Sequence, residues 1–341
     1  MERYVSWLVF HHGEDVSLSS VSRSCEVSIS VVIPARNAEK TLARALDSVL
    51  VQRRAPCETI IVDDASSDTT AAIAASFADR GVRIVALDRQ RGAAGARNVG
   101  IEAARGDWIA FLDADDEWLP HKLEKQVAAI RAHPDVSFVF CASHEFAPSG
   151  RFLGDTYQGR PVRDDENAWK ALLACNFVAT PTVVARRELL LRLGGFNEAL
   201  KVAEDQDMWI RLALEAAPAY VPESLVRVHV RHESLSAWRL ADQYTYTLPM
   251  VERHLERLRH RLAASEIKSI RGERLNRVGS VAIAQGDFLH GMNLILRSAL
   301  LSYRPLHNMM LLAKLPAAKL ANRLARRFPV RGSGKAKACA R

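Results

Sequence analysis

The chain has 341 residues, of which 48% are hydrophobic and 25% are charged, values typical of a globular protein. This length leaves room for one large domain, or for one domain and a smaller appendage. No apolar run approaches the roughly 18–20 residues of a membrane span. We also expect no signal peptide, because His and acidic residues follow the short apolar patch near the N-terminus too soon.

The net charge of +8 comes from 47 basic and 39 acidic residues. Residues 319–341 contain eight Lys or Arg and no Asp or Glu, so the rest of the chain is near neutral. The basicity therefore belongs to the tail, and we expect no nucleic-acid binding by the main domain. The five Cys are scattered without a C-x-x-C pair, which indicates a reducing compartment and argues against a disulfide framework or a zinc site.

Strand and helix patterns alternate in the first half of the chain. Apolar, β-prone runs that end at Pro or Asp predict strands, and amphipathic or small-residue stretches predict helices. The predicted strands are 29–33, 59–62, 82–87 and 108–112, and the predicted helices are 40–51, 68–77 and 93–104. Ser66, Ser67 or Asp68 is the expected N-cap of the second helix. The alternating order predicts a doubly wound parallel sheet with right-handed crossovers.

The second half is less regular. Strands are predicted at 136–141, 182–184 and 225–230, and helices at 188–193, ended by Gly194-Gly195, and at 205–216. Residues 142–166 are predicted as loop, and the helical pattern after about residue 241 is broken at Pro249, Gly286 and Pro305. The predicted organisation is an N-terminal extension (1–27), an α/β domain (28–240), a helical C-terminal region (241–318) and a basic tail (319–341).

The segment Asp113-Ala114-Asp115 is the most informative one, and it directly follows the apolar run 108–112. In parallel α/β sheets, ligands bind beyond the carboxyl ends of the strands. Two Asp at alternate positions offer hard oxygen ligands, which suit Mg²⁺ or Mn²⁺ held against a phosphate. The segment therefore predicts a buried strand, a divalent metal and a phosphorylated substrate at one place.

Five motifs, in their order and spacing, resemble those of the family 2 glycosyltransferases. They are SVVIPARN (30–37), VDDASSDTT (62–70), GAAGARNVGI (92–101), FLDADDEW (111–118), and GGFNE followed by AEDQDMWIRL (194–212). Each motif alone is a weak signal, and the specificity comes from all five together. The resemblance covers residues 28–240 and implies an α/β fold of the GT-A type, a Rossmann-like mixed sheet flanked by helices, here with a C-terminal helical extension.

The resemblance implies that the first two motifs bind a nucleotide. Pro34, Arg36 and Asn37 follow the first strand, where they would face the base. Arg36 stands where many relatives have an aromatic residue, so it would stack on the base, reach a phosphate, or remain a solvated residue of a Pro turn. By the same resemblance Asp64 would contact the base, whereas Asp63 would order the loop.

The third and fourth motifs are expected to hold the diphosphate and the metal. Gly92 lets the helix N-terminus approach the nucleotide, where exposed N–H groups favour anions. Arg97 would touch the diphosphate, lock the Asp-containing loop, or form a purely structural salt bridge. The family resemblance makes Asp115 the metal ligand and Asp113 a ribose contact or a second ligand. Asp116 is expected either to join this site or to cap the next helix.

The fifth motif implies the proton acceptor. The family uses an acidic residue of an E-D pair as catalytic base, and Asp205 is our choice, with Glu204 as the fallback and a helix cap as the alternative role. Trp209 would line the acceptor pocket or belong to the core. His232 resembles the late His that some relatives place on the metal or diphosphate, and His229 competes for that role.

Together these features predict a cytoplasmic, bacterial, inverting glycosyltransferase with a nucleotide-sugar donor, a glycan or lipid-linked acceptor and a divalent metal (Mg or Mn), acting in surface polysaccharide or glycoconjugate synthesis. The alternatives are a catalytically inactive nucleotide-sugar-binding relative and a nucleotidyltransferase, although the latter usually has a Gly-rich basic loop after the first strand. Amphipathic basic patterns at 292–301 and 309–320 suit either peripheral contact with the inner face of an anionic membrane or a helical cap on the domain.

Overall fold

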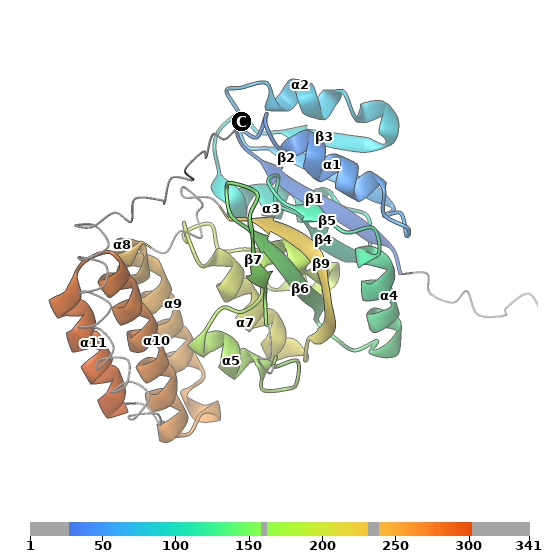
Figure 1. The fold of residues 1–341 in the computed structure, drawn as a ribbon. Coiled ribbons are helices and arrows are strands. Elements are labelled where there is room, and N and C mark those ends of the chain that lie inside the picture. Colours follow the sequence, from blue (N-terminus) through green and yellow to red (C-terminus); the bar gives the residue numbers. More distant parts are fainter. Residues whose placement is uncertain (1–26, 158–161, 231–238, 302–341) are drawn as a thin grey trace, which may run out of the picture.

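The computed structural model describes residues 27–157, 162–230 and 239–301, and the structural statements below concern these ranges. A nine-stranded mixed sheet runs through the main domain, with helices packed on both faces (Figure 1). The strand order is β3-β2-β1-β4-β8-β6-β9-β5, and β7 pairs with β6 outside this path. The predicted N-terminal extension, the basic tail, Pro305 and His232 lie outside the described residues.

The first four strands form the parallel part of the sheet, as the alternating pattern predicts. They are β1 (Ile29–Ala35), β2 (Glu58–Asp63), β3 (Val82–Ala86) and β4 (Trp108–Phe111). The crossovers contain α1 (Leu42–Leu50), α2 (Thr70–Ala75) and α3 (Gly92–Ala103). β1 pairs in parallel with both β2 and β4, so the carboxyl ends of these strands meet at one edge.

The rest of the sheet is mixed rather than parallel. It contains β5 (Glu117–Trp118), β6 (Phe138–Phe146), β7 (Phe152–Asp155), β8 (Val184–Arg186) and β9 (Ala219–His229). β8 runs antiparallel to β4, and β6 pairs in parallel with β9. The predicted loop at 142–166 is therefore wrong at its start, because β6 continues to Phe146 and turns into β7. Pairing with β9 satisfies this backbone, and no local pattern encodes that partner.

Four α-helices lie in the described second half of the domain, and one of them ends where the sequence predicts. They are α4 (Lys122–Ala132), α5 (Ala168–Ala174), α6 (Arg187–Arg192) and α7 (Glu204–Glu215). After α6, Gly194 and Gly195 have φ values of 78° and 71°, and the Gly195 amide donates to the carbonyl of Leu190 over 2.9 Å. This left-handed turn confirms the predicted C-cap. The predicted strand at 182–184 is shifted, because residues 180–182 form a 3₁₀ turn.

Helices of the C-terminal region pack beside α5 and α7 (Figure 1). They are α8 (Leu240–Asp242), α9 (Leu248–Arg257), α10 (Ala264–Ala284) and α11 (Phe288–Leu301). Gly286, with φ of 95°, separates α10 from α11 as predicted. Pro249 does not break the helix, because it lies in the first turn of α9, directly after a π-helical turn at 243–247. Within the described ranges, no helix is both long and apolar enough to cross a membrane.

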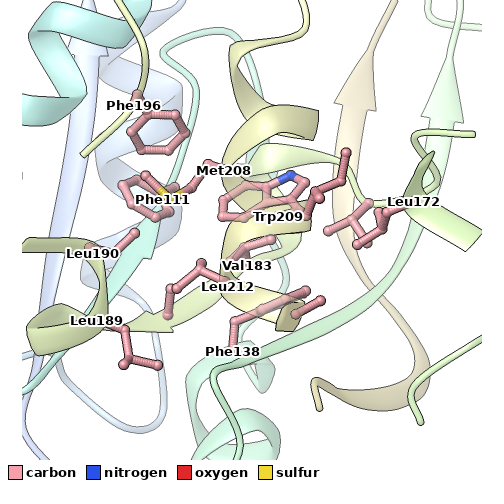
Figure 2. Packing of buried hydrophobic residues seen from close by; sticks show 14 of the residues in the cluster. Phe111, Phe138, Leu172, Val183, Leu189, Leu190, Phe196, Met208, Trp209 and Leu212 are labelled. Atoms are coloured by element: carbon pink, nitrogen blue, oxygen red, sulfur yellow. The ribbon is translucent and has the colours of Figure 1, made fainter. Parts of the chain in front are cut away.

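The sheet separates two hydrophobic cores. One lies under α1 and α4, and the other lies under α3, α5, α6 and α7 and continues into α9 and α10. Trp209 is fully buried in the second core, with its ring 5.7 Å from Phe138 and 5.8 Å from Phe196. Figure 2 shows Trp209 among Phe111, Phe138 and Leu172. Trp209 is thus a core residue rather than a wall of an acceptor pocket.

Candidate functional site

Three of the motifs meet at the carboxyl edge of the parallel strands. Ala35, in β1, pairs in register with Asp63, and the Asp64 amide donates to the carbonyl of Ala35 over 2.8 Å. On the other side of β1, the Leu112 amide donates to the carbonyl of Val32 over 3.2 Å. Pro34, the Asp63-Asp64 pair and the segment Asp113-Ala114-Asp115 therefore converge, as the topology of a doubly wound sheet requires.

Arg36 and Asn37 fasten the first loop to the second. Asn37 has φ of 46°, which orients its side chain so that Oδ1 accepts the amide of Ser67 over 2.9 Å. The Asn37 amide donates to Oγ of Ser66 over 3.0 Å, and the exposed Arg36 donates through Nη1 to the carbonyl of Asp64 over 3.1 Å. These bonds hold the two loops against each other and leave the side chain of Arg36 exposed.

Asp64 joins the second motif to the third. The residue is 3% exposed, and its carboxylate accepts the Arg91 amide at Oδ1 over 2.6 Å and the Gly92 amide at Oδ2 over 2.9 Å. Gly92 has φ of 76° and begins α3, so the carboxylate fixes the start of this helix. A carboxylate oxygen has two lone pairs, so each oxygen retains one acceptor site for a base. Asp63 orders its loop as predicted, by accepting the Ser66 amide over 3.2 Å.

Arg97 connects two acidic motifs that are far apart in the sequence. Nη2 lies 2.8 Å from Oδ1 of Asp113, and Nη1 lies 2.8 Å from Oε1 of Glu204. The Arg97 side chain is 6% exposed, against 29% for that of Asp113. Burial alone would lower the pKa of Arg97, but the charges of Asp113 and Glu204 raise it above its usual value. These ion pairs hold the loop of Asp113 against the start of α7, and the contact of Arg97 with a diphosphate stays a prediction.

The carboxyl groups of Asp113, Asp115 and Asp116 lie close enough at this edge to influence one another electrostatically. Burial raises the pKa of Asp116 well above its usual range, and the charges of Asp115 and Asp113 raise it further. Asp116 does not cap the next helix, because α4 begins at Lys122 and Asp116 accepts the amide of His229 over 2.9 Å. A divalent cation fits these neighbouring carboxyl groups, since Mg²⁺ usually takes one or two carboxylates together with waters and phosphate oxygens.

Two observations indicate that protein side chains would supply few of the ligands of that cation. Within the described ranges, no group of three or more His, Cys, Asp and Glu has an arrangement that could hold a metal ion. His229, one candidate for the late His, is instead 2.7 Å from Oε1 of Glu117 and stacks on Phe146 with ring centroids 5.7 Å apart. The other candidate, His232, lies outside the described residues. Most ligands of a cation here would therefore come from substrate and water.

Asp205 has a different environment from its neighbour Glu204. Oδ1 accepts the Gln206 amide over 2.6 Å, and Oδ2 accepts Nδ2 of Asn176 over 2.9 Å. Burial raises the pKa of Asp205 to about 7, and the charge of Glu204 adds to this shift. Ala203, which precedes the Glu204-Asp205 pair, has φ of 63°, an uncommon backbone conformation for alanine. A carboxylate with a pKa near 7 is suited to accept a proton.

Several residues that sequence reasoning overlooked organise the site. Asn98 clamps the turn after α6, since Oδ1 accepts the Phe196 amide over 2.7 Å and Nδ2 donates to the Phe196 carbonyl over 2.9 Å. Glu198 binds Arg91 through a 2.6 Å ion pair. Asn98 stands in the third motif and could have been found there, whereas Asn176 belongs to a stretch without a recognisable pattern.

The family model of glycosyl transferase family 2 matches residues 30–190. The chain is 34% identical over 220 residues to the succinoglycan biosynthesis protein ExoO of Rhizobium meliloti. This alignment covers 61% of this chain and 62% of ExoO. It is 32% identical over 184 residues to the glucosyltransferase WfgD of Escherichia coli, in an alignment that covers 54% of this chain and 69% of WfgD. The chain spans less than two thirds of the length of several curated relatives that it matches.

Solved structures support the fold. The crystal structure of Staphylococcus aureus TarS 1–349 in complex with UDP-GlcNAc superposes with a TM-score of 0.63, covering 89% of this chain and 92% of that one at 21% identity. This likeness, together with the mixed sheet flanked by helices, confirms the predicted GT-A architecture. The contacts of Asn37, Asp64 and Arg97 join the five motifs, and with these relatives in sequence the chain belongs to glycosyltransferase family 2.

Proposed function

We propose that this protein transfers a sugar from a nucleotide-diphosphate donor to an acceptor hydroxyl, with inversion at the anomeric carbon, in surface polysaccharide or glycoconjugate synthesis. The observation that carries the proposal is the bridge made by Arg97. It joins Asp113, beside the proposed metal ligand, to Glu204, beside the proposed base, with 2.8 Å contacts on both sides. The donor side and the acceptor side of a transfer reaction are thereby held in one rigid unit.

Asp205 is the proposed proton acceptor. Glu204 is poorly suited to this role because it is buried and paired with Arg97, whereas Asp205 receives its hydrogen bonds from an amide and a side-chain amide. Each Asp205 oxygen keeps a lone pair for the acceptor hydroxyl. Asp205 would take the proton of the acceptor hydroxyl while the hydroxyl oxygen attacks the anomeric carbon and the nucleoside diphosphate leaves. This single displacement inverts the anomeric centre and requires no enzyme nucleophile.

Asp64, Arg36 and Asn37 are proposed to contact the nucleotide, with Gly92 at the anion-binding start of α3. Asp115, assisted by Asp113, would hold a divalent metal, with His232 as a further ligand. When bound, such an ion would act as a Lewis acid on the leaving diphosphate. Burial raises the pKa of Asp116, and the charges of Asp115 and Asp113 raise it further; a cation beside these carboxyl groups would offset that repulsion.

Relatives suggest the substrate classes. WfgD is named as a transferase from UDP-glucose to a GlcNAc-diphosphoundecaprenol acceptor, and TarS was solved with UDP-GlcNAc. We therefore infer a UDP-sugar donor and a glycan or lipid-linked acceptor for this chain as well. A lipid-linked acceptor would place the protein in the cytoplasm at the inner face of the membrane, and an exposed apolar face of α11 supports such contact. Binding to anionic vesicles tests this part of the proposal.

The donor site is tested by thermal unfolding with UDP-, GDP- and TDP-sugars in the presence of Mn²⁺. Binding to the folded state alone stabilises it by about 2.7 kcal/mol at a ligand concentration of 100 Kd. We expect stabilisation by a UDP-sugar, its loss in Asp115→Asn, and its retention in Asp205→Asn, which should lose sugar transfer instead. The exposed Asp79→Asn serves as the matched control.

Each contrary result has a distinct meaning. Stabilisation by no sugar nucleotide contradicts the donor site. Unchanged transfer by Asp205→Asn contradicts the choice of base. Donor binding without any turnover by the native protein supports the alternative of a catalytically inactive nucleotide-sugar-binding protein.

A further inference from the structure

We propose that Asn176 is a positioning residue that orients the carboxylate of Asp205 for proton transfer. The inference rests on the proposed function, in which Asp205 is the base. Asn176 lies between α5 and the 3₁₀ turn at 180–182, in a part of the chain that carries none of the five motifs. Its Nδ2 lies 2.9 Å from Oδ2 of Asp205, and the two residues are 29 positions apart.

The Asp205 carboxylate is held from two sides. The Gln206 amide fixes Oδ1 over 2.6 Å, and Asn176 fixes Oδ2 over 2.9 Å. One hydrogen bond to each oxygen prevents rotation of the group and leaves one lone pair on each oxygen. Without Asn176, Oδ2 would be free to turn, and the direction of the remaining lone pairs would no longer be set.

Asn176 itself is fixed by its surroundings. Its Oδ1 accepts the amide of Val178 over 3.3 Å, which leaves Nδ2 directed to Asp205. The preceding helix, α5, is tied to α7 because Nε2 of Gln206 donates to the carbonyl of Leu172 over 2.5 Å. Asn176 and Gln206 therefore connect the end of α5 to the start of α7 by two separate bonds.

The C-terminal region secures the same end of α5. Arg274 on α10 is 3% exposed, and its Nε donates to the carbonyl of Leu173 over 2.7 Å. Its Nη2 donates to the carbonyl of Leu172 over 3.2 Å. A cation at the carboxyl end of a helix is favoured by the helix dipole and satisfies carbonyls that the helix leaves unpaired. Lys170 adds a 2.8 Å ion pair to Glu266. The placement of Asn176 thus depends on α10.

The test compares Asn176→Ala and Asn176→Asp with Asn167→Ala. Asn167 precedes the other end of α5 and makes no side-chain cap bond, so it is a matched control. The probe is UDP release from UDP-glucose with Mn²⁺, followed against pH. We expect kcat to fall about tenfold or more in Asn176→Ala, since small misplacements of reacting groups are costly, while KM for UDP-glucose changes less than about twofold.

The pH profile separates positioning from a merely structural role. Asn176 donates a hydrogen bond to the charged carboxylate, so its removal should raise the pKa of Asp205 and shift the acidic limb of the profile upward from about pH 7. Asn176→Asp should shift the limb further because it adds a like charge. Asn167→Ala should leave the limb in place. An unchanged kcat and limb in Asn176→Ala, alongside an inactive Asp205→Asn, overturns this inference alone.

A second measurement needs no substrate. Urea unfolding of the native protein, Asn176→Ser, Asp205→Asn and the double variant between pH 5 and pH 8 gives the coupling between the two positions. We expect a coupling that grows as Asp205 ionises, and a coupling that is absent at every pH overturns the inference. Full transfer activity in Asp205→Asn overturns the assignment of the base and the inference with it.

Discussion

Two adjacent carboxylates, Glu204 and Asp205, differ in role because their environments differ. Glu204 is bound to the buried Arg97, which keeps it paired. Asp205 has only uncharged hydrogen-bond donors, and burial together with the charge of Glu204 raises its pKa to about 7. When two neighbouring carboxyl groups have different environments, one can serve a structural role and the other can transfer protons.

This difference predicts how Asp205→Asn changes stability with pH. Asp has a pKa of about 3.9 in an unfolded chain, so the folded protein binds more protons between about pH 4 and pH 7. The native protein should lose stability as the pH rises through this window, and Asn cannot ionise. We expect Asp205→Asn to be more stable than the native protein at pH 8, by on the order of 2 kcal/mol, and similar to it at pH 4.

Urea denaturation at both pH values measures the effect. The control is Glu188→Gln on α6, where the Glu188 side chain is 79% exposed. Its stability relative to the native protein should not depend on pH. An equal gain for Asp205→Asn at pH 4 and pH 8 would contradict the raised pKa.

At the scale of elements, α3 shows that its small residues serve two purposes. Gly92 begins the helix with a positive φ of 76°, which fits the predicted approach to the nucleotide. Gly100 instead faces the sheet, where an added Cβ would lie 2.3 Å from Cγ1 of Val32 in β1. The absence of a side chain at Gly100 lets α3 lie close to the sheet. This distance also places the start of the helix, whose amides bind Asp64.

Substitution of Gly100 by Ala separates packing from helix propensity. Propensity alone would stabilise the helix by about 0.5–1 kcal/mol. The contact with Val32 should reverse the sign, and we expect a loss of about 1–3 kcal/mol in denaturant unfolding. Glu102→Ala, at an exposed position of the same helix, should change stability by less than about 0.5 kcal/mol. A stabilised Gly100→Ala would show that α3 moves away at no cost.

Across the whole molecule, charge and apolar surface are both concentrated toward the C-terminus. Residues 302–341 contain ten Lys or Arg and no Asp or Glu, whereas residues 1–301 contain 37 basic and 39 acidic residues. The preceding helix, α11, exposes Leu289 (84%), Met292 (39%), Leu296 (49%) and Leu300 (88%) at helical spacing. An apolar helix face next to a cationic segment is typical of contact with an anionic membrane surface.

Sedimentation with vesicles tests this contact in the full chain. We expect binding to vesicles that contain phosphatidylglycerol, weaker binding to pure phosphatidylcholine, and a decrease with salt. Leu289→Gln combined with Leu296→Gln should weaken binding at least about tenfold, because each buried Leu contributes roughly 1.5–3 kcal/mol. Leu191→Gln on α6, at a side chain that is 41% exposed, is the control. Equal binding by both variants would exclude α11 as the face that contacts the membrane. A dimer that buries this face of α11 would show that a second copy of the chain covers it instead.

The parallel half of the sheet and the family follow from local sequence patterns alone. The spacing of apolar runs sets β1 to β4 locally, and parallel strands with short crossovers place their carboxyl ends together, so Asp64 and Asp113 could be assigned to one edge. The stop after α6 followed from Gly194 and Gly195, because few residues other than glycine adopt positive φ without strain. The core position of Trp209 remained open, since its spacing suits either role.

The contacts between residues that are distant in the sequence follow from the packing of the folded chain. The pairing of β6 with β9, the capture of Asp116 by the backbone of His229, and the bridge from Arg97 to Glu204 join residues about 80 to 113 positions apart. Such contacts depend on chain folding in three dimensions and leave no periodic trace in the sequence. The same holds for Asn176, whose bond to Asp205 arises because α5, α7 and α10 pack together.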